Sequence, residues 1–147
     1  MVGNSKRWLQ YFGPERPEAR VNLVGFAFAG SGASIFARWQ ALAPAWLRVV
    51  GVALPGRENR HQEPSVCTIA DMVDPIVHAL TSLDGKPFVL YGHSLGAVLA
   101  YEVVRKLGPI GRVPSHLFVA VRRAPHLPRP HAQMHKLDDD AFISAMG

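Results

Sequence analysis

The 147-residue sequence contains one cysteine, four lysines and no long apolar run. The single Cys67 excludes a disulfide within the chain and is typical of a reducing compartment. No apolar stretch reaches the roughly 18 residues that span a bilayer. The polar, basic residues 1–7 also lack the apolar segment that follows in a signal peptide. We therefore expect a cytoplasmic protein with no membrane partner.

Acidic residues are scarce as well, with 11 against 16 lysines and arginines and a net charge of +5. The cations are scattered over several loops, without the aromatic and basic stripe of a nucleic-acid-binding surface, so we expect no nucleic acid partner. The seven histidines lack the spacing of a metal-ligand set, and we expect no metal. The positive charge favours an acidic protein partner, unless acidic sequence outside this chain offsets it. With 48% apolar and 18% charged residues, the composition is typical of one globular core.

A strand–turn–helix pattern surrounds one serine. Residues 88–91 are apolar and predict a buried strand, and residues 95–107 lack helix breakers and predict a helix. Between them, Gly92-x-Ser94-x-Gly96 matches the nucleophile elbow, a strained turn that presents a serine hydroxyl at the carboxyl end of a sheet. Glycines at these two positions let the strand and helix backbones approach closely. Ser94 is therefore the predicted nucleophile, and the first-turn amide of Leu95 is a predicted oxyanion donor.

The remaining segments alternate between strand and helix patterns. Residues 1–20 predict an N-terminal arm lying on the domain. Apolar runs predict strands over 21–28, 48–54 and 116–121. Helical spacing predicts a helix over 35–43 with Ser34 as its N-cap. A second helix starts either at Thr68, with a kink at Pro75, or at Asp74, with Pro75 in its first turn.

This alternation predicts an α/β fold with a parallel sheet and right-handed crossovers. If strand 21–28 lies between strands 48–54 and 87–91, the loops 29–33 and 92–96 open side by side, where such sheets bind ligands. The glycine-rich stretch 29–34 does not match G-x-G-x-x-G, and no acidic residue stands about twenty positions on, so we expect no dinucleotide site. The loop can instead aim a second backbone amide at the oxyanion.

These residues together resemble a type II thioesterase of the α/β-hydrolase superfamily, the stand-alone editing enzymes of polyketide and nonribosomal peptide assembly lines in antibiotic biosynthesis. The likeness runs from about Trp8 to the C-terminus and rests on four motifs in order, Ala29–Ser34, Leu54–Arg60, Gly92–Ala97 and Arg122–His126. It implies a three-layer α/β-hydrolase fold, with a parallel sheet between two layers of helices, and a serine hydrolase that acts on acyl thioesters. One departure is Ala27, where these enzymes usually carry proline.

The resemblance also implies roles for single residues. Ser94 would be the nucleophile, and the amides of Ala29 and Leu95 would form the oxyanion hole. The substrates would be acyl groups on the phosphopantetheine arm of an acyl or peptidyl carrier protein, and the enzyme itself would need no cofactor. We further expect the basic residues at the carboxyl edge of the sheet to attract the acidic carrier, chiefly Arg57, Arg60, Arg122 and Arg123.

The rest of the catalytic triad is the larger departure. The superfamily places its acid and then its histidine after the serine. After Ser94 the only carboxylates are Glu102 and Asp138–Asp140, and the last histidine, His135, precedes the aspartates. Glu102 lies about 12 Å along the elbow helix, too far to orient a base beside the serine. The family places the acid and histidine beyond residue 147, after a lid.

We therefore interpret residues 1–147 as a partial α/β-hydrolase domain, with 138–147 as the start of the lid, and expect this chain to be weakly active or inactive alone. His93 is expected to pack or to line a pocket, while His126, His131 and His135 are expected to be solvated or to contact the lid. Two alternatives stay open: a noncatalytic remnant that still binds a carrier protein, and a general esterase of the same superfamily.

Overall fold

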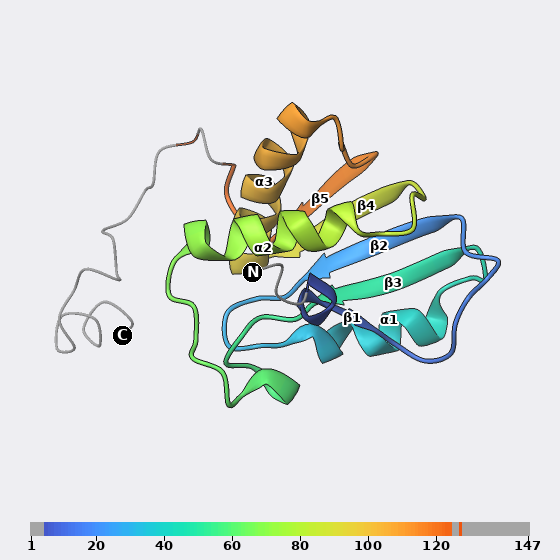
Figure 1. The fold of residues 1–147 in the computed structure, drawn as a ribbon, viewed down its shortest axis with the longest axis horizontal. Helices are drawn as coiled ribbons and strands as arrows, with labels where there is room; N and C mark the ends of the chain where they lie inside the picture. The colour runs from blue at the N-terminus through green and yellow to red at the C-terminus, as the bar shows by residue number, and fades with distance from the viewer. Residues whose placement is uncertain (1–4, 125–126, 128–147) are drawn as a thin grey trace, which may run out of the picture.

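A five-stranded sheet with the order β1-β3-β2-β4-β5 forms the centre of the computed structural model (Figure 1), which describes residues 5–124 and 127. Strands β2 to β5 run parallel, and β1 pairs antiparallel with β3 at one edge. The strands are β1 (Leu9–Tyr11), β2 (Val21–Phe26), β3 (Leu47–Val52), β4 (Phe88–His93) and β5 (His116–Ala120). The predicted α/β fold is confirmed, and so is the placement of the first predicted strand between its two neighbours.

Helices cover both faces of the sheet, because successive side chains of each strand point to opposite sides. Val24 and Phe26 of β2 belong to the core cluster that α2 (Ile69–Thr81) and α3 (Leu95–Leu107) share with the strands. Gly25, between them, faces the other way: a Cβ there would lie 2.5 Å from the Phe36 ring. Phe36 belongs to the second layer, which consists of a 3-10 turn, η2 (Ala33–Phe36), and α1 (Ala37–Leu42).

The part of the chain that the structure describes has three further 3-10 turns, η1 (Ser5–Trp8), η3 (Glu58–Arg60) and η4 (Gly108–Ile110). None of the helices within residues 5–124 has the length and apolar composition that a bilayer crossing needs. The segment 128–147, which contains the predicted lid start, lies outside the described residues, as do His126, His131 and His135.

Part of the N-terminal arm is an edge strand that the sequence analysis did not predict. Leu9 pairs with Val52, and Ala53 donates a backbone hydrogen bond to Trp8 at 2.9 Å. Further along, Arg16 donates to the carbonyls of Gln40 and Ala43 at 2.8 Å each, at the end of α1. The segment is thus held to β3 and α1 by backbone pairing and by side-chain hydrogen bonds.

One of the two predicted helix starts, at Thr68, is confirmed, and the other, at Ser34, is wrong. Thr68 is the N-cap of α2, since its hydroxyl accepts a hydrogen bond from the Asp71 amide at 3.2 Å and Pro75 lies inside the helix, so a start at Asp74 is wrong. The prediction of Ser34 as an N-cap is also wrong. The helix over 35–43 begins as a 3-10 turn after Gly32, and the Ser34 hydroxyl hydrogen-bonds Glu58 instead.

Candidate active site

Ser94 is the single residue between the end of β4 and the start of α3, and its backbone conformation is one that few residues adopt. Its φ of 53° and ψ of −110° lie on the left-handed side, which costs a non-glycine residue on the order of 1–3 kcal/mol. Two backbone hydrogen bonds hold it there: its amide donates to Ala120 at 2.9 Å, and its carbonyl accepts from Ala97 at 3.1 Å. This is the strained strand-to-helix turn that the sequence motif predicts.

The two flanking glycines make this turn possible because other backbone segments occupy the space of a side chain. A Cβ on Gly92 would lie 2.5 Å from the Ala97 Cα. A Cβ on Gly96 would overlap the Phe26 and Ala27 carbonyl groups, where the chain leaves β2. The predicted close approach is confirmed, and it brings the end of β2 directly against the elbow.

The loop after β2 continues beside the elbow. The Phe28 ring packs against the His93 ring, with 5.3 Å between their centroids, which fits the expected packing role of His93. Ser31 donates to the Phe28 carbonyl at 3.1 Å, and Gly30 between them has a φ of +84°, so residues 28–31 form a tight turn. Ala29 is exposed in this turn. The amide of Leu95, on the other side, is the first of α3 and has no acceptor within the helix.

The four arginines expected to attract a partner occupy different environments. Arg57 and Arg122 are exposed, and so is Arg123, whose side chain has an interaction partner. Arg122 and Arg123 line a groove of about 620 Å³ that runs between α3 and the end of β5. Arg60 is buried, with only 7% of its surface exposed. Its guanidinium is therefore unsuited to meeting a partner protein.

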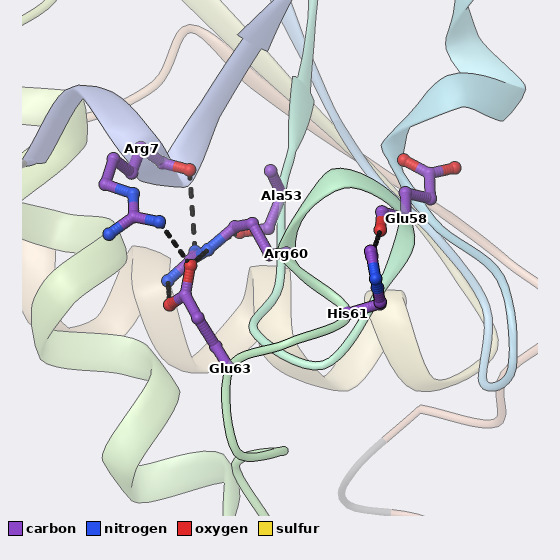
Figure 2. Close-up of polar contacts among 6 residues, drawn as sticks. All are labelled: Arg7, Ala53, Glu58, Arg60, His61 and Glu63. Atoms are coloured by element: carbon purple, nitrogen blue, oxygen red, sulfur yellow. Dashed lines mark hydrogen bonds and ion pairs between the residues drawn. The ribbon is translucent and has the colours of Figure 1, made fainter.

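Arg60 instead ties three segments together. It donates to the Ala53 carbonyl at 2.7 Å and makes two hydrogen bonds to the Glu63 carboxylate at 3.0 and 2.6 Å (Figure 2). Its guanidinium also lies 4.8 Å from the Trp8 ring centroid. The hydrogen bonds from Arg60 hold the pKa of Glu63 below its ordinary value. The burial of Arg60 could not be predicted from the charged loop that contains it, because this burial depends on residues that are distant along the chain.

The acid and the base of a triad are not assembled around Ser94 by the described residues. Within 5–124 and 127, the Ser94 hydroxyl has no hydrogen-bond partner. Glu102 forms an ion pair with Arg105 at 3.0 Å on α3, in keeping with the expectation that it does not serve the serine. The same residues contain no group of three histidine, cysteine or carboxylate side chains that could hold a metal ion.

One contact near the site was missed. The Glu58 carboxylate, from the loop after β3, hydrogen-bonds both the amide and the hydroxyl of Ser34 in the loop after β2. Both residues belong to motifs that the sequence analysis singled out, which was the available signal. Their pairing could not be inferred, because it joins residues 24 positions apart.

Known proteins resemble this chain in sequence or in fold. Linear gramicidin dehydrogenase LgrE of Brevibacillus parabrevis is 38% identical over 130 residues, which cover 88% of this chain and 49% of that protein. The type II thioesterase BorB from the borrelidin biosynthetic cluster superposes with a TM-score of 0.78 at 30% identity, covering 95% of this chain and 56% of that one. RedJ, a thioesterase of the prodiginine pathway in Streptomyces coelicolor, has a TM-score of 0.75 at 38% identity, covering 90% of this chain and 50% of that one.

This chain thus spans about half the length of these relatives. Residues 21–147 match the thioesterase domain family. The chain therefore belongs to the thioesterase family, with an α/β-hydrolase fold, and groups with the type II thioesterases of polyketide and nonribosomal peptide biosynthesis.

Proposed function

We propose that this protein is a cytoplasmic editing thioesterase, which removes acyl groups from the phosphopantetheine arms of acyl or peptidyl carrier proteins. The observation that carries the proposal is the left-handed backbone of Ser94 at the junction of β4 and α3. Strain of this kind persists only where the surrounding structure imposes it, and it is concentrated at functional sites. The family membership supports the reaction type, since the members hydrolyse thioesters.

In the proposed reaction, the Ser94 hydroxyl oxygen attacks the thioester carbonyl, and a general base takes the hydroxyl proton. The carbonyl oxygen becomes an oxyanion that accepts hydrogen bonds from the amides of Ala29 and Leu95. Collapse of the intermediate breaks the carbon–sulfur bond, and the base returns the proton to the phosphopantetheine thiolate. Water then hydrolyses the acyl-serine ester by the same steps.

The carrier protein would approach the carboxyl edge of the sheet. Arg57 and Arg122 are exposed in loops that follow β3 and β5, so both lie at the edge where β4 delivers Ser94. Arg123 adjoins Arg122, while the burial of Arg60 removes it from this surface. Exposed cations of this kind increase the association rate with an acidic partner and lose their effect as salt is added.

Three other functions are less well supported. The name of the gramicidin relative describes a dehydrogenase, but the loop after β2 lacks the glycine spacing of a dinucleotide site. A carrier-binding protein without catalysis would not need the strained serine. A general esterase would use the same elbow, and only its substrate preference distinguishes it.

The test uses the protein expressed from its complete reading frame, with Ser94→Ala and Ser115→Ala, an exposed serine, as its matched control. Exposure to an acylated carrier protein or to a fluorophosphonate should add one group to the wild type and to Ser115→Ala, as measured by intact mass. Ser94→Ala should gain none. An adduct on Ser94→Ala would exclude this serine as the nucleophile. Carrier binding without turnover would favour the noncatalytic alternative, and faster hydrolysis of oxygen esters than of thioesters would favour the esterase.

A further inference from the structure

A single carboxylate fastens the loop after β2 to the loop after β3. The Ser34 amide donates to the two Glu58 carboxylate oxygens at 3.1 and 3.2 Å, and the Ser34 hydroxyl donates to the first of them. Gly32 makes room for this contact, because a Cβ there would overlap the Glu58 carboxylate. Ser34 ends the glycine-rich stretch that starts at Ala29, so the contact secures the loop that carries the proposed oxyanion donor.

Glu58 projects from a turn that is itself well held. Its φ of 46° is unusual for a residue with a side chain, and its carbonyl accepts two bonds from His61, one from the amide at 3.1 Å and one involving the ring nitrogen Nδ1 at 2.8 Å. The buried Arg60 anchors the same turn to the body of the domain. Figure 2 shows the Glu58 side chain on the opposite side of this turn from the Arg60 and Glu63 cluster. The turn therefore offers the carboxylate a fixed position.

The loop that receives this contact needs an external restraint. It contains Gly30, with a φ of +84°, and Gly32, and glycine gives a backbone more freedom than any other residue. An oxyanion donor must keep a fixed position, since a displacement of about 1 Å can cost on the order of 100-fold in rate. Hydrogen bonds to a charged acceptor are among the strong ones, which makes Glu58 an effective restraint.

We propose that Glu58 is a positioning residue for the oxyanion hole, holding residues 29–34 so that the Ala29 amide stays aimed at the reacting carbonyl. This inference rests on the proposed function. Glu58 acts through the loop and not on the substrate. Its loss therefore weakens the binding of the oxyanion and leaves the ground-state affinity for the thioester nearly unchanged.

The experiment compares Glu58→Ala and Gly32→Ala in the protein expressed from its complete reading frame. Gly32→Ala displaces the carboxylate without removing its charge, and the φ of −126° at Gly32 tolerates alanine. Glu63→Gln is the matched control, because it removes a carboxylate of the same segment whose side-chain hydrogen bonds, within residues 5–124, come from Arg60 and Arg7. We measure kcat and KM for an acyl thioester, the affinity for its trifluoromethyl ketone analogue, which binds as an oxyanion, and the melting temperature.

Both Glu58→Ala and Gly32→Ala should lower kcat by about 10- to 100-fold with KM within about threefold of the wild type. The affinity for the ketone analogue should fall by the same factor as kcat/KM. Glu63→Gln should lower the melting temperature only slightly, since that carboxylate is partly exposed, and leave kcat within about twofold. The positioning role is overturned if kcat of Glu58→Ala and Gly32→Ala stays within about threefold, or if kcat falls while ketone affinity does not change. It is also overturned if Glu63→Gln produces the same kinetic loss.

Failure of the proposed function gives a different result. A wild-type protein that forms no adduct at Ser94 would overturn both proposals at once. Active wild-type protein with unchanged kcat in Glu58→Ala would overturn only the positioning role. If Glu58→Ala does not fold, Gly32→Ala and Glu58→Gln carry the same test, since the glutamine keeps one of the two carboxylate acceptors and should give an intermediate loss of kcat.

Discussion

Replacing Arg60 by methionine should lower the free energy of unfolding by about 2 to 4 kcal/mol. A hydrogen bond from a charged donor contributes about 1.5–3 kcal/mol, and Arg60 makes one to the Ala53 carbonyl at 2.7 Å in a buried position. Its position over the Trp8 ring adds about 0.5–1 kcal/mol. The ion pair with Glu63 adds little, because that carboxylate is partly exposed. Methionine keeps the apolar stem and loses each of these contacts.

The assay is urea denaturation at pH 7, with Arg57→Gln as the matched control. Arg57 is exposed in the same loop, so its replacement should change the unfolding free energy by less than about 0.5 kcal/mol. An Arg60→Met protein within about 0.5 kcal/mol of the wild type, at an unchanged denaturant slope, would refute the structural role of Arg60 and return it to the surface proposed for the carrier protein.

The pH dependence gives an independent check. Hydrogen bonds from Arg60 lower the pKa of Glu63 in the folded protein. A carboxyl with a lowered pKa contributes stability above its unfolded pKa of about 4.3, and that contribution is lost as the pH falls through the folded value. The difference in unfolding free energy between the wild type and Arg60→Met should therefore become smaller below about pH 4. A gap that widens in acid would contradict the assignment of the Glu63 shift to Arg60.

Three further outcomes are expected. Gly96→Ala should reduce phosphonate labelling of Ser94 at least about tenfold, because the new Cβ overlaps backbone at the end of β2, and labelling at the wild-type rate would show that the elbow can relax. Replacing Arg57 and Arg122 together by glutamine should weaken carrier binding most at low salt and leave the hydrolysis of a small thioester nearly unchanged. Equal losses on both substrates would mean that these arginines support the fold. Burial raises the pKa of Asp84, but the hydrogen bond from Asn22 and interactions with Lys86 outweigh it and lower the pKa. Asp84→Asn should therefore reduce the loss of stability as the pH falls below about 4, and an acid titration as steep as that of the wild type would contradict this.

The features that the sequence predicted are those with a local cause. The apolar runs and the helical spacing set β2 to β5, α2 and α3, because each pattern repeats over at least five residues of its own segment. The elbow was predictable because its motif lies within one short segment: Gly92 is required by the nearby backbone of Gly96 and Ala97, although Gly96 also meets backbone at the distant end of β2. Their effect on the turn does not depend on the details of side-chain packing.

The features that were missed depend on contacts between distant segments. Strand β1 has three residues, too few to show a period of two, and it forms only because β3 offers an unpaired edge. The buried Arg60 lies against Trp8, which is distant from it along the chain. No pattern within the charged loop itself distinguishes this arginine from the exposed Arg57.

The Leu54–Arg60 motif shows how a short segment can combine three roles. Arg57 is exposed, Glu58 reaches the loop after β2, and Arg60 is buried against Ala53. The positive φ of Glu58 and the 3-10 turn that it starts point consecutive charged side chains in different directions. Replacing the whole motif would therefore change stability, oxyanion geometry and partner attraction together. Single substitutions separate these effects, because each side chain contacts a different part of the molecule.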